Sequence, residues 1–207
     1  KWNLHRRIAL TIISAIGTNM DRIVLGFMIA TGFLSMWISN TATAMMMVPI
    51  GLAIIYQISD ALKDNPSIDT SKENFGFGKA LMLGIAYSAS LGGIATLIGT
   101  PPNTLLAGAI DKMYGIELSF AKWMLFGVPL AWSFIFIAWF YLVKFAYPSK
   151  IKTLPGGRRI IDSEKKKLGR ASTEEKVVLV IFILAAFSWI TRTFLLSKFI
   201  DGLSDGV

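Results

Sequence analysis

The chain has 207 residues, of which 54% are hydrophobic and 16% are charged, and its mean hydropathy is +0.57. These values are typical of a membrane protein and exclude a disordered chain. Because cysteine is absent, neither a disulfide framework nor a thiolate metal site can form. The single histidine, His5, excludes any site that needs two imidazole groups.

The formal net charge of +8 comes largely from one segment. Residues 144–176 hold ten of the 21 Lys and Arg residues, together with four acidic residues. A nucleic-acid-binding protein would need its basic residues spread over a folded, exposed surface, so no nucleic acid is expected as a partner. A concentrated basic segment between apolar stretches is typical of a loop on the cytoplasmic side of a lipid bilayer.

Residues 1–20 predict an amphipathic helix lying at the membrane interface. Trp2, His5, Arg6 and Arg7 precede isoleucines mixed with threonine and serine, a pattern too short and too polar to span. We interpret His5 as a polar anchor at the headgroups and not as a ligand. The chain begins at Lys1 with neither a methionine nor a signal peptide, which predicts an internal portion of a longer protein.

Residues 21–59 predict a re-entrant helical hairpin. Residues 23–58 carry no charge, but a polar cluster, Ser39-Asn40-Thr41, divides them into arms of 16 and 17 residues. At about 1.5 Å per residue, each arm covers roughly 25 Å, which is less than the ~30 Å hydrocarbon core. We therefore expect the tip to end inside the membrane, although the parity of the spans alone would also allow two full crossings.

Residues 60–79 predict a polar cytoplasmic loop, and residues 80–110 predict a transmembrane helix that is broken within the bilayer. The break is expected at residues 99–103 (GTPPN), because proline lacks an N–H donor and forces its predecessor out of helical geometry. Irregular backbone at that depth is stable only where protein or a watery cavity satisfies it. A packing kink at the two prolines is the alternative interpretation.

The remaining apolar segments predict two further transmembrane helices. Residues 123–147 predict an unbroken span with an aromatic end, residues 148–176 a basic cytoplasmic connector, and residues 177–196 the next span. A capping sequence at Ser172 predicts the start of that last helix. We interpret Arg192, near the end of the span, as a side chain that extends to the interface.

The two interruptions predict a binding site made of uncharged groups, which is the layout of a secondary transporter. A helix that ends inside the bilayer presents unpaired carbonyls, which suit a cation. One that begins there presents unpaired N–H groups, and these, with side chains at Asn40, Thr41 and Thr100, suit an anion. No Lys or Arg lies near either tip to balance an anion, and no Asp or Glu lies there to carry a proton. Sodium bound by oxygen ligands is therefore the simplest remaining counter-ion for the anion.

An isolated Ser or Thr in a membrane helix has a purely structural interpretation. Ser14, Ser88 and Thr96 are each expected to bond a carbonyl four residues earlier or a neighbouring helix. For the cluster at the hairpin tip we favour a binding role, because a turn, a missing charge and a short arm coincide there.

The sequences WISNTATAMMMVPI, at the hairpin tip, and IATLIGTPPNTLLAG, after an apolar helix, occur in this order. With these paired motifs the chain resembles the divalent-anion sodium symporter family, and in particular its INDY-type bacterial dicarboxylate transporters. The resemblance implies an all-α membrane protein of the bacterial cytoplasmic (inner) membrane, one half of an inverted-repeat, elevator-type transporter that forms a homodimer. In such a transporter the hairpin, the broken helix and residues 123–143 would belong to the moving unit. The first helix and residues 144–176 would act as connectors, and residues 177–196 would be a helix of the fixed scaffold. The family has a second Ser-Asn-Thr tip, which this sequence does not contain.

The resemblance also implies the roles of individual residues. The sodium ligands are side-chain or carbonyl oxygens of Ser35, Ser39, Asn40 and Gly99. The residues expected to contact one carboxylate of the substrate are Asn40, Thr41 and Thr100. Where family members carry Ser at the position of Thr100, the hydroxyl is kept here with an added methyl group.

The sequence therefore predicts sodium-coupled transport of a C4-type dicarboxylate such as succinate, malate or fumarate. A related hairpin permease for sulfate, phosphate or citrate is the alternative among transporters, and a non-transporting membrane subunit is the alternative outside them. An enzyme is not expected, because no acid, base or nucleophile constellation lies at membrane depth.

Overall fold

The computed structural model describes residues 4–17, 19–63, 75–149 and 157–192. As predicted, these residues form an all-helical structure. In chain order the elements are α1 (Leu4–Ile16), α2 (Met20–Ser35), α3 (Asn40–Ala61), α4 (Gly76–Gly93), α5 (Pro101–Tyr114), α6 (Phe120–Tyr141), a π-helical turn (Leu142–Ala146), α7 (Gly157–Lys167) and α8 (Thr173–Thr191).

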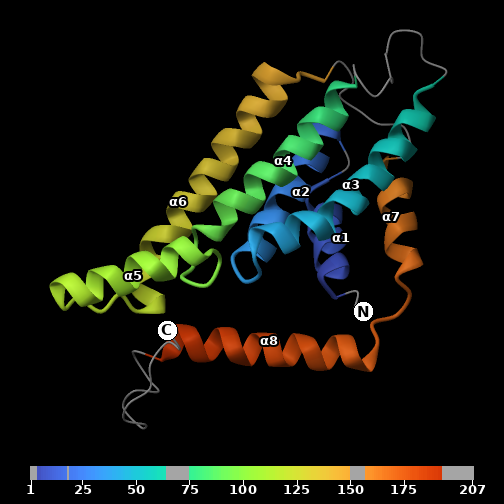
Figure 1. Ribbon diagram of the computed structural model, residues 1–207. Helices are drawn as coiled ribbons and strands as arrows, with labels where there is room; N and C mark the ends of the chain where they lie inside the picture. Colours follow the sequence, from blue (N-terminus) through green and yellow to red (C-terminus); the bar gives the residue numbers. More distant parts are fainter. Residues whose placement is uncertain (1–3, 18, 64–74, 150–156, 193–207) are drawn as a thin grey trace.

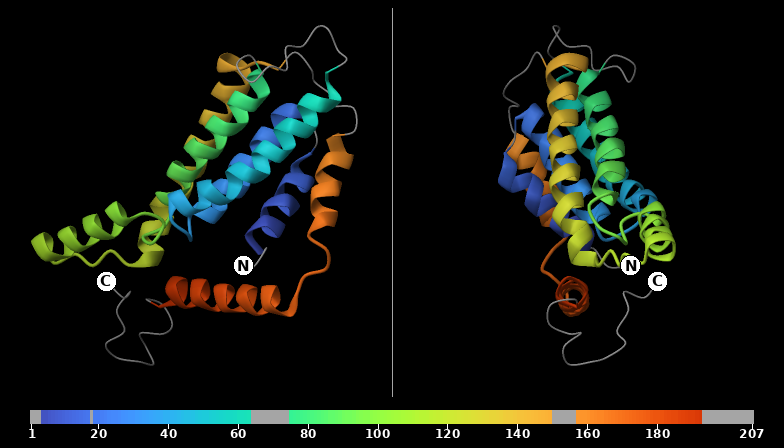
Figure 2. Two further views of the ribbon diagram at one scale, coloured as in Figure 1. Left: turned by 45° about the vertical axis from the view of Figure 1, so that its right-hand side comes forward. Right: turned by 90° about the vertical axis from the view of Figure 1, so that its left-hand side faces the viewer.

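Helices α2, α3, α4 and α6 form a bundle, with α5 projecting from one end and α8 crossing beneath it (Figure 1). Figure 2 also shows α8 apart from the bundle, and its right-hand view shows α8 nearly end-on. The closest approach in the bundle joins α2 to α4, where a Cβ atom at Gly92 would collide with the backbone of Gly32. Glycine at both positions lets the two backbones pack in direct contact, as is common between membrane helices.

The short helix α1 buries one face against α2. Ala9, Leu10 and Ile13 are fully buried, and a Cβ atom at Gly26 of α2 would lie 3.0 Å from the Cα atom of Ile13. This spacing of buried residues is typical of an amphipathic helix, because residues three and four apart lie on one face. The predicted amphipathic helix is present, and its position at a membrane interface stays a prediction.

Helices α2 and α3 are joined by residues 36–39 and correspond to the two arms of the predicted hairpin. The predicted length of the second arm is wrong, because α3 continues to Ala61 and has 22 residues. Of the described helices, α3 and the segment 120–146 are long and apolar enough to cross a membrane. The argument for re-entry from arm length therefore applies only to α2, which has 16 residues, and re-entry stays a prediction.

The break in the following membrane helix comes earlier than the expected residues 99–103. Helix α4 ends at Gly93, residues 94–100 form a turn, and α5 begins at Pro101. Proline suits the first turn of a helix, because its missing N–H would have no intrahelical partner there in any case. The two prolines therefore start α5, whereas the glycine pair that closes α4 has a low helix propensity and favours the stop.

The basic connector contains a helix, α7, that the sequence analysis did not predict. Helix α8 begins as predicted, since the hydroxyl of Ser172 accepts a hydrogen bond of 3.2 Å from the N–H of Glu175. The prediction for Arg192 is wrong: its side chain is buried, and Nη2 lies 2.5 Å from Oε1 of Glu117 in the α5–α6 loop. Parts of the predicted segments lie outside the described residues, namely 1–3, which include Trp2, and 18, 64–74, 150–156 and 193–196.

Candidate functional site

The two interruptions lie against each other. The hydroxyl of Thr96, in the turn after α4, donates a hydrogen bond to the carbonyl oxygen of Met36, in the turn after α2. The same hydroxyl accepts a hydrogen bond of 3.1 Å from the N–H of Gly99. Thr96 is fully buried, so one side chain joins both breaks inside the protein. This agrees with the structural interpretation of an isolated threonine, with a neighbouring segment as its partner.

Helix α6 supports the break after α4. Nε1 of Trp123 donates a hydrogen bond of 2.9 Å to the carbonyl oxygen of Ile94. A Cβ atom at Gly127 would lie 2.8 Å from the carbonyl oxygen of Ala95, so glycine allows α6 to approach the turn. These contacts give two carbonyl groups of a broken helix a defined position, which is the condition for irregular backbone at membrane depth.

Aromatic rings hold the hairpin tip from the other side. The ring of Trp37 stacks on Phe120 of α6 with the ring centroids 6.2 Å apart, and it meets Phe182 of α8 edge-on at 5.3 Å. Such pairs add stabilisation beyond the burial of their area. The tip is therefore fixed between α6 and α8.

The centre of the site is the contact between Ser35 and Asn40 across the tip. Oγ of Ser35 lies 2.7 Å from Oδ1 of Asn40 and 2.6 Å from the carbonyl oxygen of Ala89 in α4. Ser35 is fully buried. A hydroxyl has one proton, so it can donate to only one of these two oxygens at a time. Oγ of Ser35 thus lies within hydrogen-bonding distance of groups on two other helices. Hydroxyl, amide and carbonyl oxygens of this kind are ligands that suit a hard cation.

Two glycines make room for this contact. A Cβ atom at Gly93 would collide with the side-chain amide of Asn40, and a Cβ atom at Gly99 would collide with the carbonyl group of Gly93. Both glycines are buried. The structure therefore brings three predicted site residues, Ser35, Asn40 and Gly99, together around the end of α4.

The other predicted residues border this centre. Ser39 is exposed and caps α3, its hydroxyl accepting a hydrogen bond of 3.4 Å from the N–H of Ala42. Thr41 follows in the first turn of α3 and is exposed. Thr100 is partly buried at the start of α5, where its side chain makes no capping hydrogen bond. Thr41 and Thr100 thus lie at the starts of α3 and α5. The sequence predicts that these two helix starts bind an anion.

Sequence reasoning missed Asn103. This side chain is buried, and its Nδ2 donates hydrogen bonds to the carbonyl oxygens of Gly93 (2.9 Å) and Thr96 (2.7 Å). It therefore ties the first turn of α5 to the end of α4 and to the intervening turn. The signal was an asparagine directly after two prolines, since asparagine is unfavourable inside a helix and bonds nearby backbone groups.

Two other isolated serines bond carbonyl groups of their own helices, Ser88 four residues earlier as expected and Ser14 three residues earlier. Ser88 is buried and donates to the carbonyl oxygen of Gly84 within its own helix at 2.6 Å. Ser14 donates to the carbonyl oxygen of Thr11 at 2.9 Å. Neither side chain reaches the centre of the site through these bonds.

The site has no ionised protein group of its own, because residues 23–59 and 80–110 contain no Asp, Glu, Lys or Arg. Electrostatic attraction must come from helix ends and polar side chains. Interrupted helices whose ends meet at uncharged polar groups are an arrangement typical of secondary membrane transporters.

The chain belongs to the family described as the sodium:sulfate symporter transmembrane region, whose model matches residues 1–204. This confirms the predicted family. The chain is 50% identical to the sodium-dependent dicarboxylate transporter SdcS of Staphylococcus saprophyticus, over all of this chain and 40% of that protein. It is also 50% identical to SdcS of Staphylococcus aureus strain USA300, over 96% of this chain and 38% of that protein. The chain thus spans about two fifths of the length of these relatives.

Proposed function

We propose that this chain forms one half of a sodium-coupled transporter that moves a C4-type dicarboxylate across the bacterial cytoplasmic membrane. The observation that carries the proposal is the polar cluster formed by the buried Oγ of Ser35, Oδ1 of the partly buried Asn40 and the carbonyl oxygen of Ala89. The names of the relatives, sodium-dependent dicarboxylate transporters at 50% identity, support both sodium and the substrate class.

In this proposal sodium is bound by oxygens of Ser35, Ser39, Asn40 and Gly99. Hydroxyl, amide and carbonyl oxygens are hard ligands that suit such a cation. The first N–H groups of α3 and α5 have no intrahelical partners and carry partial positive charge. Together with Asn40, Thr41 and Thr100 they bind one substrate carboxylate, and the sodium charge balances it. Each ligand therefore raises the affinity for the other, which couples their transport.

The proposal extends to the architecture of the whole protein. The hairpin α2–α3, the broken helix α4–α5 and helix α6 move together as a substrate-carrying unit, in an elevator mechanism within a homodimer. A second repeat supplies the other half of the site. Enzyme activity is not part of the proposal, because uncharged oxygens and amides offer no general acid, base or activated nucleophile.

Sodium-dependent binding of succinate to the complete protein tests this function. The wild type is expected to bind succinate only in the presence of sodium, and Asn40→Ala and Thr100→Ala are expected to weaken binding at least about tenfold, which corresponds to about 1.4 kcal/mol. Thr104→Ala is the matched control, because its hydroxyl bonds only the nearby carbonyl of Pro101. Unchanged affinity in both test variants would remove these residues from the site.

Sulfate is a second candidate substrate, favoured by the description of the matching family as sodium:sulfate symporters. A dicarboxylate has two separated anionic groups, whereas sulfate concentrates its charge on one centre, so the two require different distances between anion-binding groups. Competition of sulfate, phosphate and citrate against labelled succinate separates these candidates. Displacement of succinate by sulfate at lower concentration than by malate would favour the sulfate transporter.

A further inference from the structure

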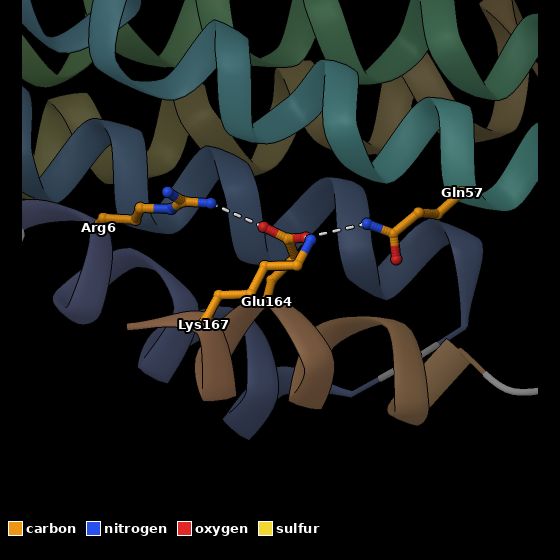
Figure 3. A network of polar contacts seen from close by, with 4 residues as sticks. All are labelled: Arg6, Gln57, Glu164 and Lys167. Carbon is orange, nitrogen blue, oxygen red and sulfur yellow. Dashed lines mark hydrogen bonds and ion pairs between the residues drawn. The ribbon is translucent and has the colours of Figure 1, made fainter. Parts of the chain in front are cut away.

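Glu164 of α7 is a buried carboxylate outside the site described above. It is 1% exposed, although it belongs to a helix rich in exposed lysines. Its carboxylate is bound by side chains from three helices: Arg6 of α1 at 2.7 Å, Gln57 of α3 at 3.0 Å, and Lys167 of α7 (Figure 3). A buried charge is costly unless it is paired and hydrogen-bonded, and here both carboxylate oxygens have partners.

The carboxylate stays ionised under physiological conditions. Burial by itself would raise the pKa of Glu164, but hydrogen bonds from Lys167, Gln57 and Arg6 outweigh it and hold the pKa below the ordinary value. Glu164 is therefore negatively charged near neutral pH. The strength of its hydrogen bonds depends on the geometry of the three donors.

The network connects to the site through α3. Gln57 lies near the end of the helix that begins at Asn40, about 25 Å away along the helix axis at 1.5 Å per residue. A contact at Gln57 therefore fixes the end of α3 opposite to the sodium and substrate ligands. Helix α3 is continuous from Asn40 to Ala61, although Pro49 within it lacks a backbone N–H donor, so the position of one end constrains the other.

The neighbouring arginine reinforces the same connection. Arg7 of α1 binds Oε2 of Glu175 at 2.9 Å and the carbonyl oxygens of Gly169 and Leu168, at 3.1 and 3.3 Å, where the chain leaves α7. Cationic donors at the end of a helix also suit its partial negative charge. Helix α1 is thus attached to α7 through Arg6 and to the α7–α8 junction through Arg7.

We propose that Glu164 is a positioning residue for transport, which holds α1 and α7 to the far end of α3 so that the three helices move as one body. The proposal rests on the proposed function, since it requires α3 to move during transport. Breaking the network in each transport cycle would expose or strand a buried charge, so the contact is expected to persist through the cycle. Loss of the carboxylate slows the movement of the site without changing its ligands.

The first test measures sodium-driven succinate uptake by the complete protein in vesicles. Glu164→Gln is expected to lower the maximal rate at least fivefold while KM and the sodium-dependent binding affinity stay within twofold. Asp162→Asn is the matched control, because Asp162 lies on the same helix and is exposed. A full rate in Glu164→Gln would overturn the proposal, and so would an equal loss of binding and rate, which indicates damage to the site itself.

The second test restores the contact chemically in the double variant Gln57→Cys, Glu164→Cys. The chain has no cysteine, so the new thiols are specific once any others in the complete protein are removed. Because the contact runs through two long side chains, a short reducible bis-thiol linker is used in place of a direct disulfide. Uptake is expected to be slow before linking and to recover at least threefold after it. Uptake that falls on linking and returns on reduction would show that the helices must separate, which contradicts the proposal.

The two tests separate this inference from the proposed function. If the wild type shows no sodium-dependent binding of succinate, the proposed function fails, and the positioning role fails with it. If the wild type binds and transports but the Glu164 variant matches it in rate, only the positioning role fails.

Discussion

Asn103 and Gly93 are joined by a hydrogen bond of 2.9 Å from the side-chain amide of one to the carbonyl oxygen of the other. This bond closes the break between α4 and α5, because it connects the first turn of the new helix to the last residue of the old one. The same Gly93 is the residue against which the amide of Asn40 packs. One glycine residue thus links the shape of the break, through its carbonyl group, to the hairpin tip, through its missing side chain.

Asn103→Ala tests this link. Removing the amide takes this donor from the buried carbonyl oxygen of Gly93, which is expected to destabilise the protein by about 1–3 kcal/mol. The carbonyl oxygen of Thr96 also loses a bond but keeps the N–H of Gly99 at 3.4 Å. Thermal unfolding of the complete protein in detergent measures the loss, and sodium-dependent succinate binding is expected to weaken with it. Thr104→Ala serves again as the control. Unchanged unfolding and binding in Asn103→Ala would show that the break is held by other contacts.

Gly93→Ala is expected to displace the side chain of Asn40. The added methyl group would collide with Oδ1 of Asn40, so the amide must move from its present position beside Oγ of Ser35. Sodium-dependent binding of succinate should weaken at least about tenfold, equivalent to about 1.4 kcal/mol. Gly108→Ala in α5 is the control: nothing lies within 4 Å of the added atom, so a small stabilisation of up to about 1 kcal/mol is expected there. Equal effects of both substitutions would contradict the packing argument.

Ser35→Ala separates a sodium ligand from a structural hydroxyl when it is compared with Ser88→Ala. Both serines are buried, but Ser88 donates to its own helix, whereas Ser35 lies against oxygens of two other helices. We expect Ser35→Ala to weaken sodium binding at least about tenfold, as titrated by succinate binding at increasing sodium, and Ser88→Ala to change it less than about twofold. A sodium titration that is equally shifted in both variants would indicate a general packing effect.

The sequence was sufficient for the helical class, the family and the two polar interruptions, because each depends on a local pattern such as an uncharged stretch or a proline pair. The residues that shape the site depend on contacts between distant positions. Gly93 is one of 18 glycines, and only the packing of Asn40 against it sets it apart. Glu164 looks like one acid in a basic loop, and its partner Arg6 lies 158 positions away. Such pairings follow from the packing of helices and have no signal in the order of residues.

The pH dependence of the free energy of unfolding should reveal the ionised network of Glu164 with Arg6, Gln57 and Lys167. The folded-state pKa of Glu164 is lowered, so its stabilising contribution is fully present above the ordinary value of 4.5 and is lost as pH falls through the lower folded-state value. The pKa of His5 is also lowered, mainly by burial and further by the guanidinium of Arg6, so its contribution is lost as pH falls below 6.5.

The two windows can be separated by unfolding measurements between pH 7.5 and pH 3.5. Glu164→Gln should be less stable than the wild type at neutral pH. The difference should begin to shrink below about pH 4.5, where the unfolded wild type takes up a proton, and should vanish once pH has fallen through the lower folded-state pKa of the carboxylate. The loss of stability between pH 7 and pH 5.5 should be unchanged in this variant, since it belongs to His5. Asp162→Asn should follow the wild type throughout. A difference between Glu164→Gln and the wild type that stays constant down to pH 3.5 would show that the carboxylate charge does not stabilise the contact between α1, α3 and α7.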